Sequence, residues 1–153
     1  MNPFQKYIKG ETALHIAVCE YVSYQYPEVL IHHSPNEGKR SPFERYLIKR
    51  MNVSSGFPDL MFVGKGKILF LELKYGNNIP SESQMKWLSE LWDYENVYSD
   101  VCSAIAWSFE SAKKIIDTVI DEDKFYSLES YRKIFYDKHD LIPKKFLKII
   151  KEI

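Results

Sequence analysis

Apolar residues recur along the chain at two spacings, and the alternation between them predicts an α/β fold. Residues 11–24 repeat apolar side chains at helical spacing, which predicts a first helix with one buried stripe: Leu14, Val18, Tyr21 and Val22. Three short apolar runs follow, at residues 29–33, 60–63 and 68–73, and runs of this length are typical of strands. Pro42 at the start of residues 42–51 favours a short helix between the first two strands.

The second half of the chain continues the alternation. A helix is predicted to begin at Ser81, an apolar strand at residues 101–107 and a helix at residues 109–119. The order is therefore helix, strand, hairpin, helix, strand, helix, within residues 1–120. Residues 121–153 are predicted to form a C-terminal helical extension, packed on the core or at a subunit interface. Its two helical patterns are Leu128, Tyr131 and Phe135, and then Phe146, Leu147, Ile150 and Ile153.

The two strands at residues 60–63 and 68–73 are joined by a Gly-rich loop at residues 64–67, which predicts a β-hairpin. If these four residues stay outside the strand pairing, Val63 faces Ile68. Extending that register places Asp59 opposite Glu72, with Cβ atoms about 5 Å apart. Because side chains alternate faces along a strand, Glu72 and Lys74 share one face.

Two carboxylates and an ammonium therefore converge on one end of an apolar hairpin. Like charges at this separation repel one another unless a cation lies between them. Mg²⁺ prefers one or two carboxylates together with water and phosphate oxygens. The hairpin therefore predicts a metal site for phosphate chemistry.

The same residues resemble a known signature. Pro58-Asp59 followed by Glu72-Leu73-Lys74 is similar to the PD-(D/E)XK motif of nucleases, and residues 32–41, Gly56-Phe57-Pro58 and the Gln84 helix resemble its VRR-NUC branch. The resemblance spans roughly residues 11–106. It implies a restriction-endonuclease-like αβββαβ core, a central mixed sheet flanked by helices, and metal-dependent cleavage of DNA.

The resemblance also implies roles for individual residues. Asp59, Glu72 and the backbone carbonyl of Leu73 are expected to bind Mg²⁺ or Mn²⁺, and the matching glutamate of the first helix, Glu11, is a further candidate ligand. Lys74 is expected to position the attacking water or to stabilise transition-state charge.

Two of the candidate residues have a structural alternative. Glu11 can instead open its helix, where the positive end of the helix dipole favours a carboxylate. Gln84 matches a catalytic position in VRR-NUC proteins, and Ser81-x-x-Gln84 is also a capping box. For Gln84 both interpretations can hold at once.

The histidines are interpreted as structural. His15 lies near the apolar stripe of the first helix, where a hydrogen-bonded core histidine is favoured. His32 and His33 are adjacent on a strand and point to opposite faces, so they cannot chelate one ion together. Neither is predicted to be a ligand.

The composition limits where on the protein a nucleic acid could bind. The 153 residues suit one domain, and the net charge of +0 excludes a strongly basic protein as a whole, so any nucleic-acid contact needs a local patch. The most basic segment contains Lys39, Arg40, Arg45, Lys49 and Arg50. A solvated polar face is the alternative, but the position just before the hairpin favours phosphate contact by Lys39, Arg40, Lys49 and Arg50.

These observations predict a divalent-metal-dependent DNA endonuclease, selective for branched DNA such as a Holliday junction. Stand-alone VRR-NUC proteins are associated with homodimers, so a homodimer is expected. No apolar leader or membrane span is present in the sequence, which predicts a cytoplasmic protein of a bacterial or virus-infected cell. The alternatives are a non-catalytic nucleic-acid-binding module and a structural or interaction protein.

Overall fold

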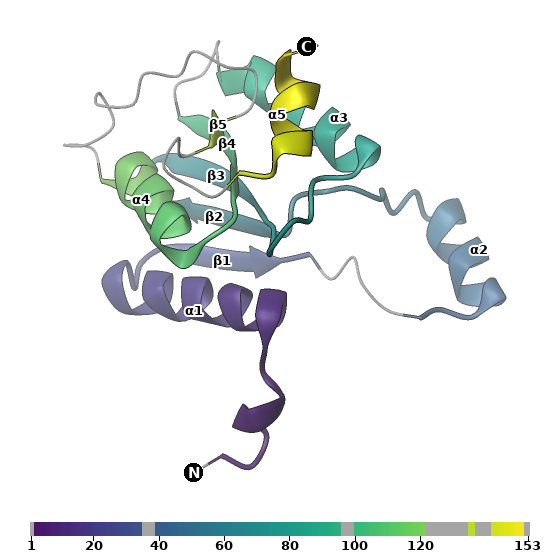
Figure 1. Cartoon of the computed structure of the whole chain (residues 1–153), viewed down its shortest axis with the longest axis horizontal. Helices are drawn as coiled ribbons and strands as arrows, with labels where there is room; N and C mark the ends of the chain where they lie inside the picture. Colours follow the sequence, from purple (N-terminus) through teal and green to yellow (C-terminus); the bar gives the residue numbers. More distant parts are fainter. Residues whose placement is uncertain (1, 35–38, 96–99, 122–134, 137–141, 152–153) are drawn as a thin grey trace.

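A mixed five-stranded sheet with strand order β1-β2-β3-β4-β5 forms the middle of the protein (Figure 1). The computed structural model describes residues 2–34, 39–95, 100–121, 135–136 and 142–151. Strands β1 to β3 pair antiparallel, and β3, β4 and β5 pair parallel. Their bounds are β1 Leu30–His33, β2 Leu60–Gly64, β3 Lys67–Leu73, β4 Val101–Ala106 and β5 Phe135–Tyr136.

Helices cover both faces of the sheet. Helices α1 and α4 lie on one face, and α3 and α5 lie on the other. The helices of the described residues are η1 Gln5–Tyr7, α1 Gly10–Gln25, α2 Pro42–Arg50, α3 Glu82–Glu95, α4 Phe109–Ile120 and α5 Lys144–Lys151. The predicted α/β class and the helix, strand, hairpin, helix, strand, helix order of the core are confirmed. In the described part of the chain, no helix combines the length and apolarity needed to span a membrane.

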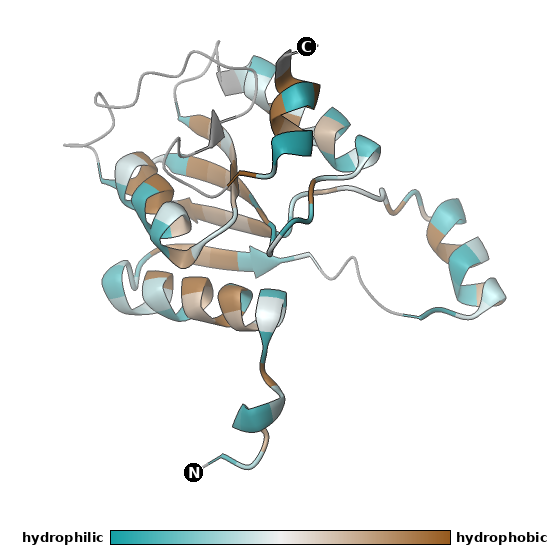
Figure 2. Cartoon of the chain, in the orientation of Figure 1, coloured by the Kyte–Doolittle hydropathy of each residue, from teal (hydrophilic) through white to brown (hydrophobic). Residues whose placement is uncertain are grey.

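The larger apolar core lies between the sheet and the pair α1 and α4 (Figure 2). Helix α1 contributes the predicted stripe residues Leu14, Val18 and Val22, all buried. They pack with the alternate residues of the strands that face the same side, including Leu60, Phe62, Leu69, Leu71, Leu73, Ala104 and Ala106. The period of two in β2 and β3 therefore decides which face of the hairpin enters this core.

A smaller core lies on the opposite face, between the sheet and helices α3 and α5. Its buried members are Leu88, Ile105, Trp107 and Phe146. Phe146 of α5 is fully buried, and its ring centroid lies 4.9 Å from that of Trp107. The apolar side of α5 therefore packs on its own chain at this residue, while Lys144, Lys145 and Lys148 are exposed.

The hairpin has the predicted register with a shorter loop. Val63 pairs with Ile68, and the pairing extends one step further to Gly64 and Lys67. Only Lys65 and Gly66 turn the chain, with φ values of 51° and 74°. Two central residues with positive φ are typical of a type I′ turn, whose twist matches that of the strands.

One prediction for the C-terminal extension is wrong. Phe135 was expected on a helical stripe with Leu128 and Tyr131, but it lies in β5, paired with Ala104 of β4. Strand pairing with β4 outweighs helical spacing here. Leu128 and Tyr131 lie outside the described residues, as do Pro35, Asn36 and Gly38, which the sequence assigns to a turn.

Candidate active site

Asp59 and Glu72 meet where the hairpin strands leave the sheet. The Asp59 backbone N–H donates to Glu72 Oε2 at 3.3 Å, and the Leu73 backbone N–H donates to Asp59 Oδ2 at 2.9 Å. These crossed hydrogen bonds place the two side chains opposite each other, as the register predicted. Glu72 is fully buried, and Asp59 retains 9% of its exposure.

Lys74 and Gln84 complete the surroundings of the Glu72 carboxylate. Lys74 Nζ lies 2.8 Å from Glu72 Oε1, and Gln84 Nε2 donates to the same oxygen at 2.5 Å. Burial, followed by repulsion from Asp59, raises the pKa of Glu72 to about 8, although Lys74 acts in the opposite direction. Ionising Asp59 and Glu72 together is therefore unfavourable in this site unless a further cation lies beside them.

Gln84 closes the predicted capping box and also contacts the Glu72 carboxylate. Its Oε1 accepts from the Ser81 N–H at 2.8 Å, its own N–H donates to Ser81 Oγ at 3.3 Å, and its Nε2 reaches Glu72. The capping box fixes the rotamer of Gln84, and that rotamer directs the amide nitrogen to the carboxylate. Gln84 is thus part of the site because it caps α3.

Gly56 allows α3 to approach the hairpin. Its φ is +86°, and a Cβ placed there would lie 2.5 Å from the Ser83 carbonyl carbon and 2.7 Å from the Gln84 nitrogen. Only glycine accommodates both this backbone conformation and this separation. The Gly56-Phe57-Pro58 sequence before Asp59 therefore sets the distance between the hairpin and the first turn of α3.

Helix α1 contributes Glu11 and His15 from the other face of the sheet. His15 Nε2 lies 3.9 Å from Glu11 Oε1 and 3.7 Å from Asp59 Oδ2. Glu11 is in the first turn of α1, so it opens the helix and also faces the site. The first turns of α1 and α3 therefore reach the same end of the sheet from opposite faces.

A divalent ion fits this donor set. The two oxygens of a carboxylate offer about four lone-pair positions. Among the described residues three donors reach Glu72, two at Oε1 and one at Oε2, so Oε2 retains a position for a cation. Ligand atoms of Glu11, His15 and Asp59 lie within 4.8 Å of one another. Ligation by Asp59, by Glu72, by Glu11 and by the Leu73 carbonyl stays a prediction.

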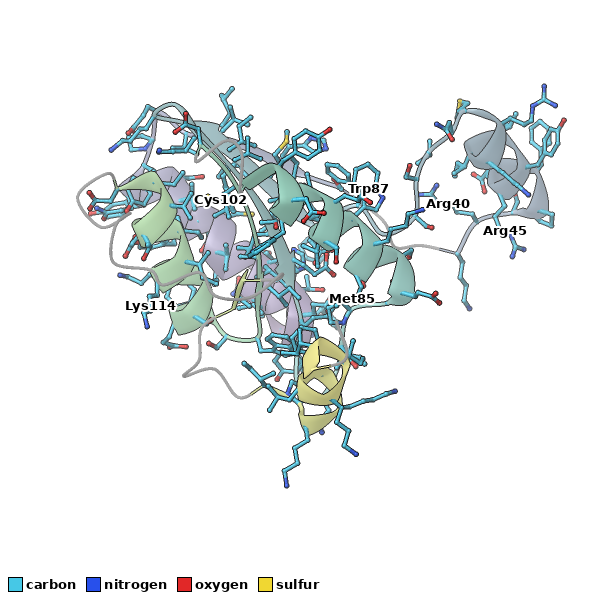
Figure 3. The ribbon with its side chains drawn as sticks, turned by 90° about the horizontal axis from the view of Figure 1, so that it is seen from above. Arg40, Arg45, Met85, Trp87, Cys102 and Lys114 are labelled. Carbon is cyan, nitrogen blue, oxygen red and sulfur yellow. The ribbon has the colours of Figure 1, made fainter. Side chains whose placement is uncertain are left out.

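The predicted nucleic-acid contacts lie in a different part of the molecule. Lys49 and Arg50 are exposed in the last turn of α2, and Lys39 and Arg40 precede that helix. Helix α2 buries none of its residues, and Figure 3 shows it set apart from the sheet, with Arg45 on it and Arg40 in the segment that leads to it. A capping box between Ser41 and Glu44, with Pro42 in the first turn, stabilises it as a helix without a core.

The sequence interpretation missed the position of His15. Its side chain is 13% exposed, and it lies between two carboxylates rather than within an apolar cluster. His33 of β1 is exposed, with its ring centroid 5.1 Å from that of His15. The available signal was the i, i+4 spacing of Glu11 and His15, which places both on one face of α1.

Comparison with known proteins supports the fold. No protein-family model matches the sequence, and no curated protein matches it either. A solved structure described as a VRR_NUC domain protein aligns with 72% of this chain and 87% of its own, with a TM-score of 0.54 and 23% identity. The resemblance predicted from the motifs is therefore confirmed at the level of the fold. This protein has the α/β fold of a VRR-NUC domain, with Asp59, Glu72, Lys74 and Gln84 gathered at one end of its sheet.

Proposed function

We propose that the protein is a divalent-metal-dependent endonuclease that hydrolyses phosphodiester bonds in branched DNA. The observation that supports this most directly is the buried Glu72 carboxylate, which Lys74 and Gln84 both contact beside Asp59. A buried cluster of two carboxylates, an ammonium and an amide is unfavourable for stability alone, because burying charge costs free energy. Such perturbed groups concentrate at functional sites.

The residues divide the work of hydrolysis between them. Asp59 and Glu72, with the Leu73 carbonyl and Glu11, would hold Mg²⁺ or Mn²⁺. Such an ion lowers the pKa of a coordinated water and neutralises charge on the phosphate. Lys74, fixed against Glu72, supplies a positive charge for the developing negative charge on the scissile phosphate. Gln84 holds the Glu72 carboxylate in place and offers an amide to the water or to a phosphate oxygen.

The activity test uses the whole protein with labelled linear, nicked, flapped and four-way-junction DNAs, each with Mg²⁺, Mn²⁺ or EDTA. Cleavage that requires the ion and favours the junction is expected. We also propose a homodimer, because two symmetric incisions resolve a junction and a two-fold dimer supplies two related sites. Light scattering at micromolar concentration tests whether the protein is a dimer.

Each failure has a distinct meaning. Junction binding without cleavage under any ion would identify a non-catalytic binding module. If the protein shows no junction binding and no ion-dependent rise in melting temperature, it is an interaction protein. Equal cleavage of linear and junction DNA would remove the branched-DNA proposal and leave the nuclease.

The α2 arm, residues 39–53, is proposed to bind the DNA backbone. The pairs Lys39→Ala with Arg40→Ala and Lys49→Ala with Arg50→Ala are each expected to weaken binding and to reduce the slope of log affinity against log salt by about 1–2. Each lost phosphate contact removes about one released counterion from the binding equilibrium. Binding is measured by fluorescence anisotropy between low and moderate salt.

The matched control for these variants is Lys144→Ala with Lys145→Ala, which removes two exposed lysines from α5, outside the arm. Its salt slope is expected to equal that of the parent. An unchanged salt slope for both arm variants would indicate that this segment is a solvated polar face and does not contact DNA.

A further inference from the structure

His15 occupies a position that a structural core histidine does not explain. It lies one turn after Glu11 on α1, and its Nε2 approaches one oxygen of Glu11 and one of Asp59, at 3.9 and 3.7 Å. Asp59 lies directly before β2, so the three groups come from two separate parts of the chain. Their ligand atoms all lie within 4.8 Å of one another.

We propose that His15 is a direct nitrogen ligand of the divalent ion, together with Glu11 and Asp59, and that it biases the site towards Mn²⁺ over Mg²⁺. This inference rests on the proposed function. Mg²⁺ and Mn²⁺ both favour oxygen ligands, but Mn²⁺ is a first-row transition metal that also binds at sites containing nitrogen, whereas Mg²⁺ is the harder ion. A site that includes His15 therefore selects a softer ion than a site whose only side-chain ligands are Asp59 and Glu72.

The spacing of the three ligand atoms suits one ion. An octahedral ion with bonds of about 2.1 Å holds neighbouring ligand atoms roughly 3 Å apart. The two His15 distances of 3.7 and 3.9 Å exceed this by less than 1 Å, which a small side-chain rotation removes. Helix α1 fixes Glu11 and His15 on one face, so the pair is preorganised relative to Asp59.

A second explanation uses the same distances. A protonated His15 would form ion pairs with Glu11 and Asp59 and would compete with a metal ion for both carboxylates. The two explanations predict opposite effects when the imidazole is removed. Loss of a ligand weakens ion binding, and loss of a competing cation strengthens it.

Isothermal titration calorimetry with Mn²⁺ and with Mg²⁺ on the full chain separates these outcomes. For His15→Ala and His15→Gln we expect Mn²⁺ affinity to fall by at least about 10–100-fold, which is the loss typical when only an outer-shell partner of a ligand is removed. Mg²⁺ affinity is expected to fall much less, so the ratio of the two affinities decreases. His33→Ala is the control, because it removes the neighbouring imidazole that lies outside the triad, and its ratio is expected to equal that of the parent.

Spectroscopy of bound Mn²⁺ provides a readout that does not depend on activity. Electron spin-echo measurements on the parent protein should detect a directly coordinated imidazole nitrogen, and His15→Gln should lose this signal.

An unchanged or raised Mn²⁺ affinity in both variants, or an equal loss for both ions, would overturn the assignment. Absence of any ion binding by the parent would instead refute the proposed function. The melting temperature without metal shows whether each variant is folded, and His15→Gln retains a polar side chain if His15→Ala is unstable.

Discussion

Lys74→Ala is expected to abolish DNA cleavage while leaving ion binding close to that of the parent protein. The ammonium contacts Glu72 at 2.8 Å, and its proposed role is to stabilise transition-state charge rather than to bind the ion, so its loss leaves both proposed carboxylate ligands in place. Removal of one such group typically lowers the rate by about 100–1,000-fold. The measurement is a single-turnover cleavage rate, paired with the Mn²⁺-induced shift in melting temperature.

The carboxylate variants are expected to behave differently. Asp59→Ala and Glu72→Ala should lose both cleavage and ion-induced stabilisation, because each removes a proposed ligand. Lys67→Ala is the matched control, since Lys67 also lies on β3 and pairs with a carboxylate, Asp100, but at the opposite end of the strand. Cleavage by Lys74→Ala within tenfold of the parent rate, or undiminished ion binding by Asp59→Ala, would show that the roles are wrongly assigned.

Gly56→Ala is expected to destabilise the protein by roughly 2–4 kcal/mol and to reduce cleavage further than that loss explains. The added methyl group meets the backbone of Ser83 and Gln84, which cannot move aside as a flexible side chain would. Relief of the clash displaces the first turn of α3, and with it the amide that contacts Glu72. Urea denaturation gives the change in unfolding free energy, and cleavage is measured well below the melting temperature.

Gly66→Ala isolates the steric part of this effect. Gly66 also has a positive φ, +74°, but a Cβ there has no heavy atom within 4 Å. Its cost is therefore conformational strain alone, about 1 kcal/mol, with no effect on cleavage. Equal destabilisation by the two substitutions would show that the approach of Gly56 to α3 does not matter.

The hairpin and its carboxylates were predictable because two local rules agree. A Gly-containing turn fixes the register, and the period of two fixes the face, so Val63 opposite Ile68 leads directly to Asp59 opposite Glu72. Gln84 was predictable for a similar reason, since capping boxes have a fixed spacing. These features depend on residues close in sequence or joined by one tight turn.

The surroundings of His15 and the strand pairing of Phe135 could not be predicted, because both depend on longer-range packing. Helical spacing indicates that His15 faces the interior, but not whether an apolar surface or a carboxylate lies opposite, and this is set by how α1 crosses the sheet. Phe135 pairs with β4, and periodicity within the tail contains no information about that edge. Phe43 of α2 and Met51, which directly follows it, are exposed apolar residues, and their exposure likewise depends on α2 packing against no core.

The place where the α2 arm joins the sheet determines how freely the sequence of the arm can change. His33 pairs with Leu60, and the Ser34 N–H donates to the Asp59 carbonyl at 2.9 Å, so the chain leaves the sheet and returns to it at adjacent positions. Loop closure costs only slightly more as a loop lengthens. Segments of other lengths and compositions can therefore be exchanged between Ser34 and Ser55 without altering strand pairing, provided that the buried Gly56 and Pro58 remain. Under the proposed function, selection could change which DNA the α2 arm binds while Asp59, Glu72 and Lys74 stay constant. A chimera that exchanges only residues 34–55 is then expected to transfer substrate preference between two proteins of this fold.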